Sequence, residues 1–308
     1  MVSGFKKGYF FVDVSHCNMC NEKSINNNII GLRLDQSQGL RPLNNSGISI
    51  TISRCSQCGL IYSNPLPVPL TIDDHYGVNP DEYWTDDELK EDPACFSGEI
   101  AKAKELLNYY PGMKALDIGA GLGKCMLAMS YAGFDVEGFE PSRLFRDKAL
   151  ENNTELSPEK LKLGTIEELD YPLNYFDFIT FGAVLEHLYD PDKALHKALH
   201  WLKEDGVIHI EVPSSDWLIA KLINLAYRLT GSNFVTNLSP MHSPFHLYEF
   251  SLKSFKENGK KNGYNLAHYQ YYVCRQPYMP KFIQPLLAWY MKKYNRGMQL
   301  KVWLRKNT

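Results

Sequence analysis

The chain has 308 residues, of which 44% are hydrophobic and 13% aromatic, and its 33 basic and 35 acidic residues give a formal net charge of −2. This length allows two domains with a sizeable core, and the near-neutral charge gives no reason to expect nucleic acid as a partner. No apolar run is long enough to cross a membrane, and the N-terminus lacks the apolar core of a signal peptide. Seven cysteines, an odd number, argue against a disulfide scaffold, so we expect a cytoplasmic protein.

The N-terminal part holds two pairs of cysteines, and both have the spacing of metal ligands: Cys17-x-x-Cys20 and Cys55-x-x-Cys58. Each pair is followed by a residue suited to a tight turn, Asn21 or Gly59. Two such pairs bring four thiolates to one tetrahedral centre, as in structural zinc sites. We therefore expect residues 1–70 to form a small zinc-ribbon-like domain. A rubredoxin-like iron site and free buried cysteines are the alternatives.

Residues 71–98 form an acidic segment with prolines, which is typical of a linker between two domains. The segment also contains three aromatic side chains, Tyr76, Tyr83 and Trp84. A second interpretation is therefore a lid whose aromatic rings cover an active site or stack on a sugar or base.

Residues 113–140 have the pattern strand, glycine turn, helix, strand. An apolar run ends at Asp117, the turn Gly119-Ala120-Gly121-Leu122-Gly123 follows, and a second apolar run ends at Glu140. This is the first half of a nucleotide-binding unit. Its glycines let the backbone pass close to a ligand, and Glu140 lies where a carboxylate would bind both ribose hydroxyls.

The acid before the glycines indicates which nucleotide is bound. A dinucleotide fingerprint reads G-x-G-x-x-G and faces a pyrophosphate, whereas here the spacing is G-x-G-x-G and Lys124 takes the sixth place. Asp117 would repel a diphosphate but attract an ammonium group. S-adenosylmethionine has an amino group for Asp117, an adenosine for Glu140 and no phosphate. The alternative is a glycine-rich turn of another α/β enzyme.

The stretch resembles the glycine motif of class I S-adenosylmethionine-dependent methyltransferases. The resemblance covers about residues 99–275 and implies an α/β fold with a Rossmann-like, seven-stranded sheet in which one strand is antiparallel. It also implies that further cofactor contacts come after the second, third and fourth strands, with these candidates: Pro141, Thr165, Ile166, Phe181 and Gly182. Together with the cysteine pairs and residues 242–251, the chain resembles bacterial methyltransferases with an N-terminal zinc-binding domain. Many of those modify sugars for surface polysaccharides or secondary metabolites.

Three histidines are candidates for a general base. His187 follows the expected fourth strand, beside the expected position of the methyl group, while His242 and His246 lie in a loop that closes over the substrate in this fold. Histidine suits proton removal near neutral pH, and a well-placed base adds roughly 10²–10⁴-fold to the rate. The alternative for each is a structural role.

Two apolar stretches are predicted to be helical. Trp217 to Leu229 is expected to form a lid on the substrate cleft, with contact to a lipid-linked substrate or a partner as the alternative. Residues 276–308 contain seven basic and no acidic residues and are predicted to form a basic amphipathic helix. Such a helix can lie on an anionic membrane surface, or it can pack on its own domain or on a second copy in a homo-oligomer.

These features predict S-adenosylmethionine-dependent methyl transfer to a small molecule, and a hydroxyl of a saccharide or sugar nucleotide is the expected acceptor. Methylation of a sugar carbon or nitrogen stays open, because the same cofactor site serves all three acceptors. An RNA-base methyltransferase is less favoured, since Phe181-Gly182-Ala183-Val184 stands where such enzymes carry Asn/Asp-Pro-Pro-Tyr/Phe. A non-catalytic cofactor-binding protein is disfavoured, because the glycine turn and both acids are intact.

Overall fold

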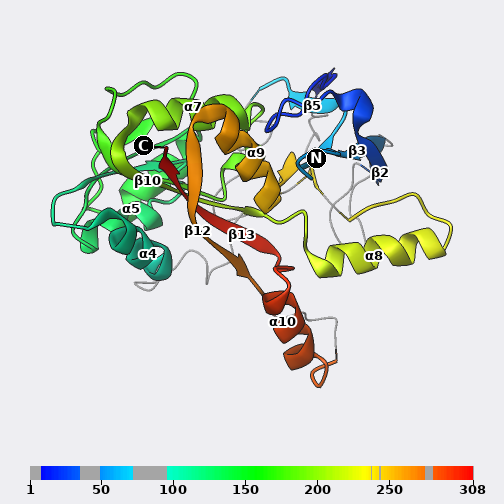
Figure 1. The fold of residues 1–308 in the computed structure, drawn as a ribbon. Helices are drawn as coiled ribbons and strands as arrows, with labels where there is room; N and C mark the ends of the chain where they lie inside the picture. The colour runs from blue at the N-terminus through cyan, green and yellow to red at the C-terminus, as the bar shows by residue number, and fades with distance from the viewer. Residues whose placement is uncertain are drawn as a thin grey trace.

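A computed structural model describes residues 8–34, 49–71, 96–236, 238–242, 244–274 and 280–307. The described chain is built around one large sheet with helices on both faces, and smaller sheets lie at one side (Figure 1). No helix in these ranges combines the length and the apolar character that a membrane crossing requires.

The large sheet has seven strands in the order β12-β13-β10-β9-β6-β7-β8. All neighbours pair in parallel except β13, which is antiparallel to both β10 and β12. This topology confirms the predicted α/β fold with one antiparallel strand. The strands are β6 (Lys114–Ile118), β7 (Asp135–Glu140), β8 (Leu161–Leu163), β9 (Phe176–Gly182), β10 (Leu202–Pro213), β12 (Tyr264–Tyr272) and β13 (Gln299–Lys306).

Two buried clusters cover the two faces of this sheet. One contains side chains from α4 and α5, and the other contains side chains from α7 and α9. The central strand β9 is buried along nearly its whole length, as expected for a parallel strand covered on both faces. The helices are α4 (Ser97–Leu107), α5 (Lys124–Tyr131), α6 (Arg143–Asn152), α7 (Pro191–Trp201), α8 (Leu218–Leu229), α9 (Leu252–Asn262) and α10 (Gln284–Lys293), with short 3₁₀ turns η1 (Ser24–Asn26) and η2 (Leu185–His187).

The prediction of one helix over residues 276–308 is wrong. Only α10 is helical within the described part, and residues 299–306 form β13, in the sheet between β10 and β12. Leu300, Val302 and Leu304 alternate along the strand and are fully buried. Alternation of this kind is the pattern of a strand, and the prediction missed it because it treated residues 276–308 as one basic, apolar-aromatic helix. The sheet therefore continues beyond the predicted limit at residue 275.

The N-terminal residues form two small sheets. A four-stranded sheet has the order β11-β4-β3-β2, and β1 pairs with β5. These strands are β1 (Tyr9–Val12), β2 (Asn28–Leu34), β3 (Ser49–Arg54), β4 (Ile61–Ser63), β5 (Leu66–Pro69) and β11 (Tyr248–Glu249). Because β11 comes from the loop after α8, the small sheet is completed by a segment far away in the sequence.

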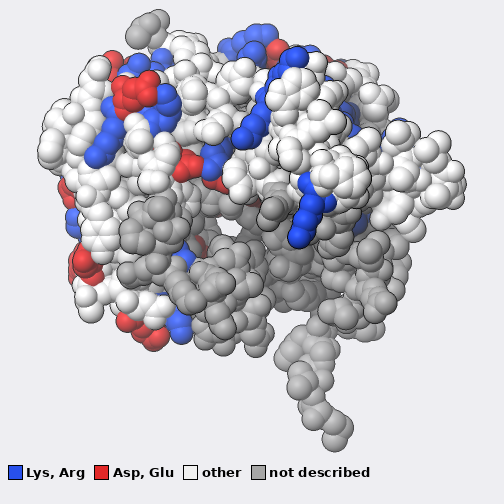
Figure 2. Space-filling view, turned by 90° about the horizontal axis from the view of Figure 1, so that it is seen from below, with Lys and Arg blue, Asp and Glu red and all other residues white. Residues whose placement is uncertain are grey.

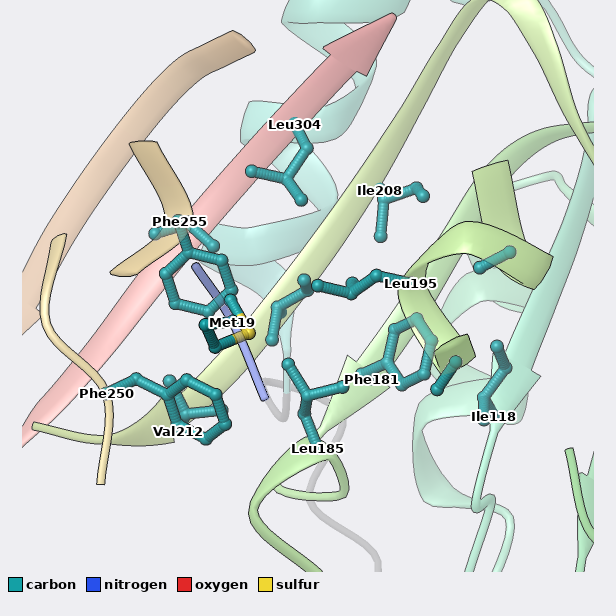
Figure 3. Close-up of a cluster of buried hydrophobic side chains, with 14 of the residues drawn as sticks. Met19, Ile118, Phe181, Leu185, Leu195, Ile208, Val212, Phe250, Phe255 and Leu304 are labelled. Atoms are coloured by element: carbon teal, nitrogen blue, oxygen red, sulfur yellow. The ribbon is translucent and has the colours of Figure 1, made fainter. Parts of the chain in front are cut away.

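The N-terminal part shares its core with the large sheet. Met19 is fully buried and lies among Phe250, Phe255 and Leu185 (Figure 3). The Asn258 amide donates to the Met19 carbonyl at 2.8 Å, which fixes the cysteine loop against α9. The two parts are thus joined by one continuous core. The predicted linker or lid at residues 71–98, with Tyr76, Tyr83 and Trp84, lies almost entirely outside the described residues.

Candidate cofactor and acceptor site

The candidate site lies at the carboxyl edge of the parallel strands. Ile118, the last residue of β6, pairs with Phe139, the next-to-last residue of β7, and also with Phe181 of β9. Gly182 pairs with Glu211 near the end of β10. The loops that follow these four strands therefore meet at one edge, which is where open α/β sheets bind ligands.

The glycine turn after β6 needs glycine for two different reasons. Gly119 has a φ of 69°, and a Cβ placed there would lie 2.6 Å from Val184 Cγ2, in the loop after β9. Gly121 has a φ of 54°, but a Cβ there would meet no atom of the described residues within 4 Å. Gly119 thus lets the two loops pack together, whereas Gly121 borders open space that a ligand can occupy.

Asp117 is buried at the end of β6, and its Oδ2 has no hydrogen-bond partner among the described residues. Burial, and then the nearby Glu140 carboxylate, raises the pKa of Asp117 to about 8. An unpartnered buried carboxyl oxygen is costly unless a ligand satisfies it. The amino group of S-adenosylmethionine fits this requirement.

Glu140 ends β7 and is held by two backbone amides. Its Oε2 accepts from Gly121 N and its Oε1 from Ser142 N, both at 2.8 Å. Burial raises its pKa to about 7, although these two hydrogen bonds oppose the rise. The carboxylate is therefore oriented toward the glycine turn, as ribose recognition requires, and the acids and glycines together fit S-adenosylmethionine.

The other predicted cofactor residues lie on the neighbouring loops. Ala120 donates its amide to Phe139 O at 2.9 Å, and Pro141 follows Glu140 directly. The Thr165 hydroxyl accepts from Glu168 N at 3.3 Å, so part of its hydrogen-bonding capacity is used within its own turn. The remaining candidates are the buried Ile166 and Phe181 and the half-buried Gly182. Their contacts with a cofactor remain predictions.

A cluster of titratable side chains lies beside the glycine turn. It comprises Glu186 and His187 in η2 and His246 in the loop before β11, and one ligand atom from each lies within 4.8 Å of the others. His246 Nε2 is 3.8 Å from Glu186 Oε1, and the rings of the two histidines are 5.0 Å apart. The fold therefore joins two of the three predicted histidines, and donors of this kind could also bind a divalent cation.

Burial sets the protonation state of this cluster. It raises the pKa of Glu186 to about 8, lowers the pKa of His187 to about 4, and holds the pKa of His246 well below its usual range. Near neutral pH the two rings are neutral and can accept a proton. Glu186 is mostly protonated, and its Oε2 has no partner among the described residues.

Glu186 was missing from the sequence-based candidates. The sequence did contain a signal that could have pointed to Glu186. This acid follows the expected fourth strand and directly precedes the candidate base His187. Its burial could not be read from the sequence, because that depends on the distant segment around His246.

His242 does not belong to this three-residue group. Its Nε2 lies 3.4 Å from Nη2 of Arg33, in β2 of the N-terminal part. Burial and the Arg33 charge lower its pKa to about 4. His242 therefore lies beside a cation of the N-terminal part and apart from the cluster of Glu186, His187 and His246.

The four predicted metal ligands converge. The Sγ atoms of Cys17 and Cys58 are 3.5 Å apart, as are those of Cys20 and Cys55, and all four thiols lie within 4.8 Å of one another. These distances exceed the ~2.05 Å of a disulfide and approach the ~3.8 Å between sulfurs in a tetrahedral zinc site with ~2.3 Å bonds.

The backbone after each cysteine pair has the turn that the sequence predicts. The two residues are Asn21, with a φ of 64°, and Gly59, with a φ of 79°. Their amides donate to Cys17 O at 2.9 Å and to Cys55 O at 3.0 Å. The donor set therefore fits a structural metal ion.

A comparison with protein families adds to this geometry. A family model described as a methyltransferase domain matches residues 97–269, more than half of the chain. The chain belongs to this methyltransferase family. The matched region includes the glycine turn, both acids and the cluster at Glu186.

Curated relatives of this methyltransferase share low sequence identity with it. A ubiquinone biosynthesis O-methyltransferase of Bradyrhizobium diazoefficiens is 27% identical over 136 residues, which cover 44% of this chain and 51% of that protein. The uncharacterized methyltransferase YcgJ of Bacillus subtilis is 28% identical over 148 residues, or 46% of this chain and 53% of that protein. The chain spans about half the length of the curated relatives it matches.

Solved structures are similar at low identity. The crystal structure of YcgJ from Bacillus subtilis is 18% identical with a TM-score of 0.47, covering 69% of this chain and 98% of that one. The [4+2]-cyclase SpnF is also 18% identical with a TM-score of 0.47, covering 73% and 86%.

Proposed function

We propose that the protein transfers a methyl group from S-adenosylmethionine to a hydroxyl of a small molecule. One observation carries this proposal: the loop with the buried Glu186 and the half-buried His187 lies against the glycine turn, where a Cβ on Gly119 would be 2.6 Å from Val184 Cγ2. A site for an amino-acid-bearing nucleoside therefore lies next to groups that can take up a proton.

Within such a site Asp117 would hold the ammonium group and Glu140 the ribose. S-adenosylmethionine supplies, when bound, a methyl group on a sulfonium that leaves without acid assistance. A neutral histidine, His187 or His246, accepts the proton as the acceptor oxygen bonds to the methyl carbon. Glu186, 3.8 Å from His246, can then stabilise the imidazolium by giving up its own proton to solvent. Much of the acceleration comes from positioning, which can supply about 7–11 kcal/mol.

We propose a saccharide or a nucleotide-linked sugar as the acceptor. A cavity of about 510 Å³ lies between the second cysteine pair and the start of α9, and Arg54, Lys253 and Lys256 are among its lining residues. Its lining also includes Asp216, which follows the end of β10 at the same edge of the sheet. Basic side chains of this kind suit the phosphates of a sugar nucleotide.

A phenolic hydroxyl is the second candidate acceptor. It is suggested by the relatives whose names assign them to ubiquinone biosynthesis. A phenol ionises more readily than a sugar hydroxyl, so it would depend less on a histidine base. Methylation of a sugar carbon or nitrogen is the remaining alternative.

The test combines cofactor binding with an acceptor panel. Calorimetry with S-adenosylhomocysteine should show binding, and mass spectrometry should detect a product with one added methyl group from a sugar nucleotide but not from a catechol. His187→Ala and His246→Ala should lower turnover by about 10²–10⁴-fold and leave cofactor affinity nearly unchanged. His196→Ala, on the outer side of α7, is the control. Full activity in both site variants would contradict the histidine base.

We also propose that the four N-terminal cysteines bind a structural zinc ion. Their thiolates converge in the part of the core that joins the two halves of the chain. Metal analysis should give one zinc per chain, and Cys55→Ser should lose it. Iron in place of zinc, with visible absorption, would favour the rubredoxin-like alternative.

A further inference from the structure

Two helices expose large apolar side chains. Along α8, Leu222, Leu225 and Leu229 are 43%, 52% and 79% exposed. On α10 and the turn before it, Phe282, Leu286 and Trp289 are 82%, 67% and 53% exposed. We call these six side chains the apolar helix pair. Exposed apolar side chains that share one face of a helix, as their spacing of three or four residues indicates, mark interaction sites more often than single ones do.

Both helices leave the sheet at the edge that carries the candidate site. α8 follows β10, and α10 connects β12 to β13; Gln299, the first residue of β13, pairs with both Pro213 and Tyr272. The bases of the helices are tied together, because Asp216 pairs with Lys221 at 2.7 Å and with Arg296 at 3.1 Å. Figure 1 shows both helices projecting from the body of the molecule.

The region of α8 and α10 carries an excess of positive charge. The sequence contains no acidic residue between 217 and 248, and none from 258 to the end. Beyond the basic residues tied to Asp216, the two helices and their flanks carry Arg228, Lys281, Lys292 and Lys293. On the face that Figure 2 shows, most of the Asp and Glu side chains lie on the side away from α8, where they are mixed with Lys and Arg.

The combination of exposed apolar side chains and basic residues distinguishes between two possible partners of this surface, a second copy of the chain and a membrane. A second copy in a symmetric dimer would place the same cations opposite each other, with no acid on either helix to offset them. An anionic phospholipid surface offers negative headgroups for the cations and an apolar layer for the leucines and aromatic rings. Trp289 and Lys293, whose Nζ lies 4.8 Å from the ring centre, have the pairing of aromatic and basic groups found at membrane interfaces.

We propose that the apolar helix pair docks the protein on an anionic membrane surface, with the candidate site facing that surface. The docking does not depend on the proposed methyl transfer. It would, however, favour acceptors that carry a lipid chain, because they present their polar end at the interface.

The test uses the full chain and large unilamellar vesicles. Co-sedimentation with vesicles of phosphatidylcholine containing about 30% phosphatidylglycerol should exceed that with pure phosphatidylcholine by at least about tenfold in affinity, and ~0.5 M salt should weaken it. Leu229→Ser combined with Leu286→Ser should reduce binding by at least about tenfold. Lys281→Gln, Lys292→Gln and Lys293→Gln together should remove the preference for anionic vesicles.

The matched control is Leu173→Ser. Leu173 is 69% exposed but precedes β9, at the opposite edge of the sheet, so its replacement should leave binding unchanged. S-adenosylhomocysteine affinity and far-ultraviolet circular dichroism should be the same in all variants. Equal binding to both vesicle types, or an equal loss in the control, would overturn the proposal. A second result would also overturn it. In that result light scattering shows a dimer that Leu229→Ser and Leu286→Ser dissociate, and the wild-type protein does not bind vesicles.

Discussion

Two glycines of one turn provide a sharp test of the site, because they differ in what surrounds them. In Gly119→Ala the new Cβ would lie 2.6 Å from Val184 Cγ2, at a φ of 69°. A left-handed conformation costs an alanine about 1–2 kcal/mol, and overpacking adds about 1–3 kcal/mol. We expect a loss of about 2–5 kcal/mol in the free energy of unfolding, measured by urea denaturation.

Gly121→Ala is the matched control. Its φ of 54° carries the same backbone cost, but within the part of the chain that the structure describes no atom lies within 4 Å of the new Cβ. We therefore expect a loss of only about 1–2 kcal/mol, together with weaker binding of S-adenosylhomocysteine in calorimetry, because the methyl group enters the space left for a ligand.

A double variant isolates the steric contribution to the loss of stability in Gly119→Ala. Val184→Ala removes the two Cγ atoms that crowd Gly119→Ala, so the double variant should be more stable than the sum of the two single changes by about 1–3 kcal/mol. If Gly121→Ala destabilises the protein as much as Gly119→Ala does, or if the two changes are additive, the packing of the two loops described here is wrong.

Three further predictions concern the acids and the thiols. Since burial raises the pKa of Asp117 to about 8, binding of the ammonium group of S-adenosylhomocysteine at pH 7 should release up to about one proton. Calorimetry in buffers of different ionisation enthalpy should show this release. Asp117→Asn should abolish it. The pKa of Glu186 rises from 4.5 to about 8 on folding, so its stabilising contribution is complete below pH 4.5 and is lost as the pH rises toward 8. The unfolding free energy of wild type minus Glu186→Gln should thus fall by up to about 1.4 kcal/mol per pH unit in this window, and a flat difference would refute the burial argument. Cys58→Ser should lower Tm and release metal, whereas Cys125→Ser, a buried thiol outside the four-cysteine group, should retain the metal.

The geometry of the candidate cofactor site could largely be predicted from the sequence, because that geometry is local. The turn at Gly119–Gly123, the acid before it and the acid that ends the next strand lie within 24 consecutive residues, 117–140. The same holds within each cysteine pair, where two intervening residues and a left-handed turn position both thiols. In such segments spacing along the chain nearly equals spacing in the fold.

The acceptor side could not be predicted in the same way. His246 and Glu186 are 60 positions apart in the sequence, and only the packing of the loop before β11 brings them to 3.8 Å. For the same reason His242 was grouped with His246, although the structure turns it toward Arg33. Burial, which sets the pKa values of these groups, is likewise a property of the whole fold.

The sequence by itself determined the α/β class, the nucleotide-binding turn with its two acids and the metal-ligand spacing, because these follow from short-range backbone geometry. Tertiary structure alone decided that residues 299–306 join the sheet as β13, that Met19 enters the shared core, and that α8 and α10 leave their apolar side chains exposed. Apolar periodicity predicts that one face of a helix or strand is buried, but the elements that bury it come from distant parts of the chain.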